Sequence, residues 1–284
     1  MAVLSFQSRV TWGHVGNSVA EFALRRIGCD CWPIDTVVFS NHPGYGRHAG
    51  RVTPAAEITR LVEGLAEVGA LSRCRALLSG YLGSPENGRA VFDAVARLKS
   101  QVPDAVWCCD PVMGDRDSGL YVHPVLARFI AEDAVAAADI ITPNHFELET
   151  LTQLSLPRLT DVLAAAYALR ASGPSLVIVS SIEDAGAASG QVATLLASGQ
   201  GAWLVETPHR PLQAKGSGDL LAALFLGRWL ATSDAKDALE FAVAGTFAVI
   251  ERTVAEPASR ELRLVAAQGD LVHPPITFPA RRLG

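Results

Sequence analysis

Two glycines and a serine precede an aspartate in the segment Lys215-Gly216-Ser217-Gly218-Asp219, directly before the apolar residues 220–226. That apolar run is typical of a buried helix. The first turn of a helix has N–H groups without intrahelical partners and lies at the positive end of the helix dipole, and glycines let this backbone approach an anion closely. A carboxylate there would repel a phosphate, but it could take a proton from an attacking hydroxyl while the backbone holds the transferred phosphoryl group. The spacing therefore indicates phosphoryl transfer, with Gly216, Ser217 and Gly218 as an anion hole and Asp219 as the base.

Polar groups follow several other predicted strands, and they strengthen this interpretation. Taken alone, Gly-x-Gly-Asp is more often a turn with an aspartate that caps a helix than a catalytic site. Ligands of parallel α/β sheets bind beyond the carboxyl ends of the strands, so several such groups at one edge favour a site over separate turns. The groups are Gln7-Ser8 with residues 13–17, residues 110–115, residues 142–149, and Ser180-Ser181. Their members include the carboxylates Asp110, Asp115 and Glu147, and Mg²⁺ prefers carboxylates together with water when it binds nucleotide phosphates.

The elements that must position these groups alternate between short apolar runs and longer amphipathic ones. The runs predict strands at 3–6, 32–39, 76–79, 105–109, 139–142, 176–179, 192–196 and 202–205. The amphipathic stretches predict helices at 17–27, 54–68, 85–99, 124–132, 145–152, 159–171, 218–230 and 235–252. This alternation predicts an α/β fold with a central, mostly parallel sheet. No repeat or long linker interrupts it, so we expect one domain over residues 1–284, with an irregular tail at 272–284.

Composition excludes several classes of function. The chain has 284 residues, of which 49% are hydrophobic and 19% charged, which is enough for a large core. The net charge is −5 without a block of Lys or Arg, which argues against nucleic acid or an anionic membrane as a partner. We expect no signal peptide and no membrane span, and five reduced, buried cysteines in a cytoplasmic protein. Walker A and G-x-G-x-x-G motifs are absent, which excludes P-loop and protein-kinase types.

With these motifs in place, the chain resembles the pyridoxal kinases of the ribokinase-like superfamily over nearly its whole length. Gly216–Asp219 and Thr142-Pro143-Asn144 belong to the superfamily as a whole. The stretch Phe39-Ser40-Asn41-His42, together with Gln7-Ser8 and Ser79-Gly80-Tyr81, is much more specific to vitamin B6 kinases. The resemblance implies a ribokinase-like three-layer α/β/α sandwich and a homodimer. It also implies ATP-dependent phosphorylation of the 5′-hydroxyl of pyridoxal, and of pyridoxine and pyridoxamine, with Mg²⁺ and a monovalent cation such as K⁺.

The resemblance assigns a role to each matching residue. It makes Asp219 the base for the 5′-hydroxyl and residues 216–218 the anion hole. The residues that would line the pyridoxal pocket are Ser8, Val15, His42, Pro43 and Tyr81. Those that would serve ATP and its cations, mostly through water, are Asp110, Asp115, Thr142 and Glu147, with Asp110, Thr142 and Glu147 at the metal. Those that would contact the nucleotide directly are Ser180, Thr207 and Pro208.

A few positions depart from the family pattern. Pro43 stands where many relatives have Thr, Ser180 where many bacterial relatives have Lys, and Arg9 where His is usual. Lys215 is either a partial substitute for the missing lysine or a solvated loop side chain, and the second interpretation is favoured.

Two other functions stay open at this point. The first is a sibling kinase for another vitamin precursor, such as hydroxymethylpyrimidine, which the Phe39–His42 stretch disfavours. The second is a vitamin B6 binding protein without turnover, which Asp219 and Glu147 disfavour because a carrier has no need of a base aimed at a hydroxyl.

Overall fold

Strands and helices alternate along the chain as the sequence predicts. The computed structural model describes residues 1–183, 185, 187–256 and 260–283. The strands are β1 (Ala2–Trp12), β2 (Asp30–Asn41), β3 (Gly50–Val52), β4 (Cys74–Ser79), β5 (Val106–Cys109), β6 (Gly114–Asp115), β7 (Gly119–Leu120), β8 (Ile140–Ile141), β9 (Leu176–Ile182), β10 (Gln191–Ser198), β11 (Gly201–Pro208) and β12 (Arg281–Leu283). The α-helices are α1 (Asn17–Arg26), α2 (Ala55–Glu67), α3 (Pro85–Gln101), α4 (Pro124–Phe129), α5 (Val135–Ala137), α6 (His145–Thr152), α7 (Leu159–Ala171), α8 (Ser217–Thr232) and α9 (Ala235–Val254). Short 3₁₀-helices cover Pro43–Tyr45 and Ala70–Arg73, and a π-helical turn covers Ile130–Ala134.

Ten strands form one mixed sheet in the order β12-β11-β10-β9-β8-β5-β4-β1-β2-β3. The neighbouring strands from β2 to β9 pair in parallel, whereas β3, β10, β11 and β12 each join the sheet through antiparallel pairing. Parallel neighbours need crossover connections, and the helices supply them. The predicted central, mostly parallel sheet is therefore confirmed.

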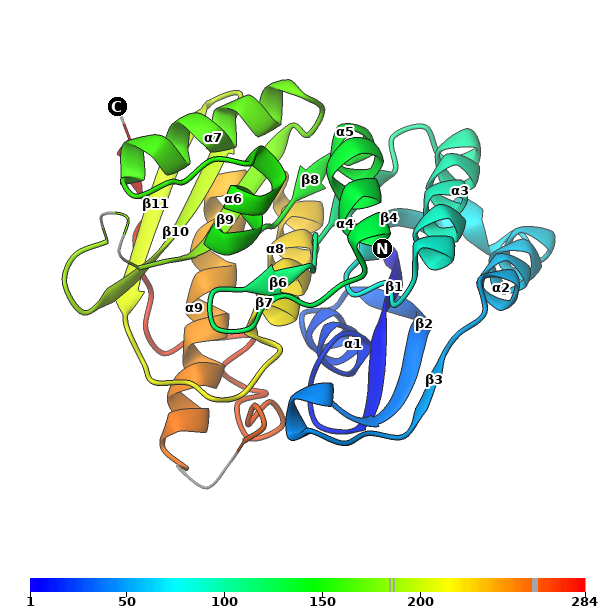
Figure 1. Cartoon of the computed structure of the whole chain (residues 1–284), viewed down its shortest axis with the longest axis horizontal. Coiled ribbons are helices and arrows are strands. Elements are labelled where there is room, and N and C mark those ends of the chain that lie inside the picture. Colours follow the sequence, from blue (N-terminus) through cyan, green and yellow to red (C-terminus); the bar gives the residue numbers. More distant parts are fainter. Residues whose placement is uncertain (184, 186, 257–259, 284) are drawn as a thin grey trace.

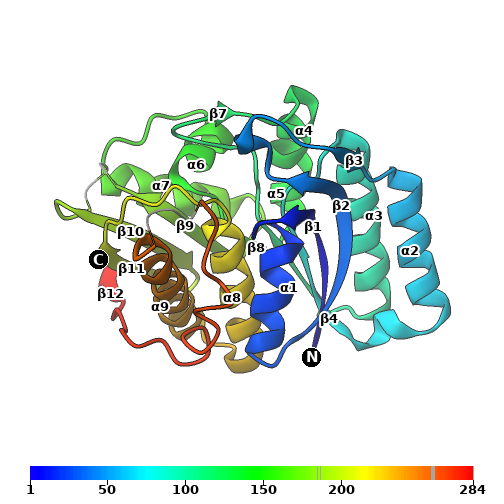
Figure 2. The same cartoon turned by 90° about the horizontal axis from the view of Figure 1, so that it is seen from below.

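Helices cover both faces of this sheet and give three layers (Figures 1 and 2). Helices α1, α8 and α9 pack on one face, whereas α2, α3 and α7 pack on the other. Successive residues of a strand point to opposite faces, so Val3 packs against the first group of helices and Leu4 against the second. The expected three-layer α/β/α sandwich is therefore confirmed.

The first strand is longer than its apolar run predicts. Strand β1 pairs with β4 as far as Phe6 and then continues to Trp12 against β2, with a register shift between Gln7 and Arg9. The prediction that Ser8 follows the strand is wrong, because Ser8 lies inside it at this irregularity. Such a bulge changes the direction in which a side chain points, and bulges occur often beside active sites.

Short elements and the end of the chain also differ from the prediction. Strands β3, β6 and β7 have only two or three residues and leave no periodic pattern to detect. The tail predicted as irregular ends in β12, which pairs antiparallel with β11 at Ala202–Leu204. All five cysteines are buried and none forms a disulfide. Within the described ranges, no helix combines the length and the apolar composition needed to cross a membrane.

Candidate active site

The amino terminus of α8 presents backbone N–H groups at the carboxyl edge of the sheet. Gly216 precedes the helix with φ of 101°, and a Cβ there would lie 2.1 Å from the His14 carbonyl oxygen, so this position requires glycine. No side chain of the described residues caps the helix. The alternative in which Asp219 caps α8 is therefore wrong. The N–H groups of the first turn remain available to an anion.

The Asp219 carboxylate is held by the loop that precedes α1. Its Oδ2 accepts a hydrogen bond from the Gly16 N–H at 2.9 Å. Gly16 in turn lies against Ser8, because a Cβ on Gly16 would be 2.2 Å from the Ser8 carbonyl oxygen. Burial raises the pKa of Asp219 to about 6, against the opposing effect of the Gly16 N–H. Asp219 is thus mostly ionised at neutral pH and basic enough to accept a proton, as a general base should be.

A second carboxylate, Asp110, is buried close to Asp219. It is 7% exposed, and the Thr142 hydroxyl donates to its Oδ1 at 3.0 Å. Burial raises the pKa of Asp110 well above its usual range, and the charges of Glu147 and Asp219 raise it further. Three carboxylates therefore meet in one region, although only two of them, Asp110 and Glu147, were predicted to lie at the metal.

Glu147 is only 4% exposed, so it is not a helix-surface residue. Its Oε2 accepts from the Asn144 N–H at 2.9 Å, and the Asn144 side chain accepts from the Glu147 N–H at 2.8 Å, which is a capping box at the start of α6. Its Oε1 accepts from the Met113 N–H at 2.9 Å. Burial raises the pKa of Glu147 to about 7 despite these N–H donors. Glu147 thus joins the segment after β8 to the segment after β5.

Asp115 and Lys215 form an ion pair across the edge of the site. Lys215 Nζ lies 2.9 Å from Asp115 Oδ2, and the two side chains are 45% and 30% exposed. Burial alone would raise the pKa of Asp115, but hydrogen bonds from Lys215 and from the Ser118 N–H lower it. Lys215 is exposed, as the favoured prediction of a solvated loop side chain has it, but it is also paired with Asp115. This ion pair connects the β6–β7 hairpin to the segment that leads into α8.

Comparison with known proteins agrees with this geometry. The family model described as phosphomethylpyrimidine kinase matches residues 57–258. Curated pyridoxal kinases PdxY from Rubrobacter xylanophilus and Deinococcus radiodurans are 46% and 44% identical, over 99% of this chain and 97% and 96% of theirs. The solved pyridoxal kinase from Leishmania donovani in complex with ADP and pyridoxamine superimposes with a TM-score of 0.91 at 29% identity, over 100% of this chain and 99% of that one. The chain belongs to the pyridoxal kinase family.

The residues predicted for the vitamer pocket lie on three segments of this pyridoxal kinase family member. Ser8 and Val15 are buried beside the loop that holds Asp219. His42 begins the Pro43–Tyr45 turn, where its Nδ1 accepts from the Gly44 N–H at 3.0 Å and leaves Pro43 exposed. Burial lowers the pKa of His42, and the charge of Lys215 lowers it further.

Tyr81 is positioned through its backbone and its ring. It follows β4, and the Thr36 hydroxyl donates to its carbonyl oxygen at 2.6 Å. Its ring packs partly against the core beneath α2 and α3. Tyr81 therefore lies at the same sheet edge as Ser8, at the end of the strand next to β1.

The predicted nucleotide residues lie at the same edge but further along the sheet. Ser180 in β9 donates its N–H to the Pro143 carbonyl oxygen at 3.0 Å, which places it beside the Thr142–Glu147 segment. Strand β11 runs parallel to β9 because each pairs antiparallel with β10. Thr207 and Pro208 therefore end at the edge that carries Ser180, two strands away.

The structure changes the interpretation of two residues, Arg9 and Glu261. Arg9 forms ion pairs with Glu21 and Asp35, both at 2.7 Å, and these pairs account for its charge. Glu261 was not predicted, yet it bonds to residues of two site segments. Its partners are 247 and 216 residues away in sequence, so no local pattern could have indicated it.

Proposed function

We propose that this protein transfers the γ-phosphoryl group of ATP to the 5′-hydroxyl of pyridoxal, giving pyridoxal 5′-phosphate and ADP in vitamin B6 salvage. The observation that carries the proposal is the Asp219 carboxylate, held by the Gly16 N–H at 2.9 Å in the first turn of an uncapped helix. Full-length relatives named pyridoxal kinase support the choice of substrate. Solved relatives in complex with ADP and pyridoxamine, and with ADP and pyridoxine, support the same pair of ligands.

The chain's own groups divide the reaction between them. Asp219 takes the proton of the 5′-hydroxyl as that oxygen forms its bond to the γ-phosphorus, and the bond from that phosphorus to the β–γ bridging oxygen breaks to release ADP. The N–H groups of Gly216, Ser217 and Gly218 hold the negative charge on the transferred group. Ser8, Val15, His42, Pro43 and Tyr81 would line the ring pocket of the vitamer.

The acidic residues fit a cation that arrives with the nucleotide. The charges of Glu147 and Asp219 raise the pKa of buried Asp110 at this edge, and a divalent cation would relieve that repulsion. No group of three His, Cys, Asp or Glu side chains in the described ranges forms a ready metal cage. Asp110, Thr142 and Glu147 would therefore hold Mg²⁺ through its water shell, which suits an ion that keeps several waters. When bound, Mg²⁺ neutralises charge on the phosphates, and the proposal also includes a monovalent cation such as K⁺.

The nucleotide would lie along the remaining part of the edge. Asp115, Ser180, Thr207 and Pro208 are the residues proposed to contact it, in addition to the carboxylates near the phosphates. The proposal takes residues 1–284 as one kinase domain acting as a homodimer in the cytoplasm. Five buried cysteines without a disulfide suit that reducing compartment.

A coupled assay of ADP release tests the proposal against its alternatives. The purified protein with MgATP is given pyridoxal, pyridoxine, pyridoxamine or hydroxymethylpyrimidine in turn. We expect the highest kcat/KM with one of the three vitamers. Turnover restricted to hydroxymethylpyrimidine would assign the protein to the sibling kinase activity instead. Tight binding of pyridoxal by calorimetry without ADP release would make it a binding protein.

A further inference from the structure

The carboxylate of Glu261, which is outside the predicted site, bonds to two segments that border the site. Glu261 Oε2 accepts the His14 N–H at 3.0 Å, and Glu261 Oε1 accepts the Tyr45 hydroxyl at 2.6 Å. The side chain is partly buried, and a Cβ on Gly13 would lie 2.4 Å from its Oε2. The carboxylate therefore fills the space that a side chain at residue 13 would occupy. It lies directly against the loop of residues 13–16.

The first of these segments, the loop of residues 13–16, contacts Asp219. The loop that contains His14 ends at Gly16, whose N–H donates to Asp219 Oδ2 at 2.9 Å. The His14 carbonyl oxygen also lies against Gly216, where a Cβ would be 2.1 Å away. A hydrogen bond that holds the His14 backbone therefore also holds the donor to Asp219 and the backbone beside the anion hole.

The second of these segments is the turn that His42 begins. Tyr45 is the last residue of the Pro43–Tyr45 turn, and its N–H donates to the His42 carbonyl oxygen at 3.1 Å. Burial and the bond to Glu261 raise the pKa of Tyr45, so its hydroxyl keeps the proton that it donates. The Arg260 guanidinium lies 4.5 Å from the centre of the Tyr45 ring. The residue pair 260–261 thus holds Tyr45 by both its ring and its hydroxyl.

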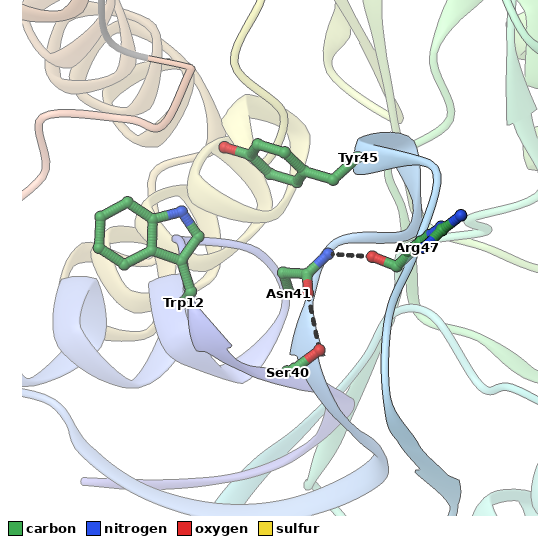
Figure 3. Close-up of a pocket in the computed structure, with 5 residues that line it drawn as sticks. All are labelled: Trp12, Ser40, Asn41, Tyr45 and Arg47. Carbon is green, nitrogen blue, oxygen red and sulfur yellow. Dashed lines mark hydrogen bonds between the residues drawn. The ribbon is translucent and has the colours of Figure 1, made fainter.

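The outer surface of this turn is open. Tyr45 and Trp12 project over one cavity of about 450 Å³, which Ser40, Asn41 and Arg47 also line (Figure 3). The turn has no buried residue, so little hydrophobic packing fixes its position. Polar contacts therefore hold it, among them the bond from Tyr45 to Glu261 and the bonds from the Asn41 amide to the carbonyl oxygens of His42 and Arg47.

We propose that Glu261 is a positioning residue that joins the turn carrying His42 to the loop carrying Gly16, so that the vitamer pocket and the catalytic aspartate are held in one arrangement. The inference rests on the proposed function, because it concerns the same pocket. Glu261 is not required to touch either substrate. Its effect should therefore appear in vitamer binding and in kcat, and not in nucleotide binding.

Tyr45→Phe tests the turn alone, since it keeps the ring under Arg260 and removes only the hydroxyl. We expect the KM for pyridoxal to rise about tenfold, the scale of one hydrogen bond to a charged acceptor, with kcat and the KM for MgATP nearly unchanged. Glu261→Ala removes both contacts and should raise the KM for pyridoxal by at least as much while lowering kcat about tenfold. Adding Tyr45→Phe to Glu261→Ala should then raise the KM for pyridoxal by much less than Tyr45→Phe does alone, because the shared contact is already lost and only the hydrogen bond between the Tyr45 hydroxyl and Trp12 is left to remove.

Conservative and matched variants separate positioning from a general loss of structure. Glu261→Gln should retain most activity, because an amide oxygen can accept the His14 N–H and an amide N–H can donate to the Tyr45 oxygen. Glu256→Ala is the control. Glu256 lies in the same region of the chain and pairs with Arg263 at 3.0 Å, and its loss should leave both KM values as they are.

The outcomes divide clearly. An unchanged KM for pyridoxal in Tyr45→Phe would overturn the inference alone, provided that the wild type phosphorylates pyridoxal. Equal increases in both KM values, or independent effects in the double variant, would also overturn it. Absence of wild-type turnover and binding with pyridoxal would overturn the proposed function, and this inference with it.

Discussion

Replacing Asp219 by Asn removes the proposed base and changes little else. The Asn side chain has the same shape, and its amide oxygen can accept the Gly16 N–H that Asp219 Oδ2 accepts at 2.9 Å. The amide NH₂ then faces the substrate hydroxyl, and it cannot take a proton. The loop before α1 and the first turn of α8 should both stay in place, so pyridoxal and ATP should bind nearly as they do in the wild type.

The size of the effect follows from the protonation of Asp219. With a pKa raised to about 6, the carboxyl group is about 99% ionised at pH 8, so the wild-type base is fully available there. Loss of a positioned general base lowers kcat by about 10²–10⁴-fold, which corresponds to about 2.7–5.4 kcal/mol in activation free energy. The assay is ADP release at saturating pyridoxal and MgATP, with binding of each ligand measured by calorimetry.

Asp234→Asn is the matched control for this substitution. Asp234 caps the neighbouring helix α9 by accepting the Asp237 N–H at 3.0 Å, and Asn is an equally good cap, so kcat should not change. If Asp219→Asn turned over within a few-fold of the wild type, Asp219 would not be the base. Loss of both ligands in Asp219→Asn would instead show that the carboxylate shapes the site, and would refute the division of roles proposed above.

Four further predictions concern the same edge of the sheet. Glu147→Gln should raise the Mg²⁺ concentration for half-maximal activity, whereas Glu149→Gln on the same helix should not; identical magnesium curves would remove Glu147 from the cation site. Tyr81→Ala should weaken pyridoxal binding by roughly 1–3 kcal/mol in calorimetry and leave an ATP analogue nearly unaffected; equal loss of both ligands, or of neither, would take Tyr81 out of the pocket. Because the base must be ionised, kcat/KM for pyridoxal should fall as the pH drops through about 6, and a flat profile down to pH 5 would contradict the pKa of Asp219. The protein without ligands should lose thermal stability as the pH rises from about 4 to about 7, because folding raises the pKa of Asp219 from 3.8 to about 6 and that of Glu147 from 4.5 to about 7 and so favours their protonated forms in this range; Asp110→Asn should lessen this loss because it removes another buried carboxyl group with a raised pKa, and an unchanged pH dependence of Tm would contradict that shift.

The secondary structure was predictable wherever the sequence pattern that indicates it lies within a few neighbouring residues. The sequence places two helices at 145–152 and 159–171, and the structure has α6 and α7 at those bounds, the first with Asn144 as its cap. Hydrophobic periodicity and cap residues both act within a few positions, so one sequence suffices to read them. The extension of β1 was missed because its pairing at Arg9–Trp12 depends on β2, and the charge of Arg9 is satisfied by Asp35 and Glu21 from elsewhere in the chain.

The site was predictable in its parts but not in its connections. Residues 216–219 could be recognised because helix start, glycines and carboxylate are adjacent. The partner of Asp219 is Gly16, 203 residues away, and the partner of Lys215 is Asp115, 100 residues away. Neither pair has a spacing that repeats or a composition that stands out. Contacts of this kind arise from the order of strands in the sheet, which brings distant segments to a common edge.

Because this edge of the sheet is acidic, the residues that bind the substrates would not also neutralise the charge of the phosphates. A cation that arrives with the nucleotide would do so. Burial raises the pKa values of Asp110, Glu147 and Asp219, and the charges of Glu147 and Asp219 raise that of Asp110 further. Lys215 precedes Gly216 in the chain, and its ammonium group pairs with Asp115. A site arranged in this way gains stability only when positive charge enters together with the phosphates. Asp219 would then face the vitamer hydroxyl as the ionised base, while Asp110 and Glu147 face the cation. The same burial that makes these carboxylates costly in the empty protein would therefore couple vitamer phosphorylation to the arrival of the magnesium nucleotide.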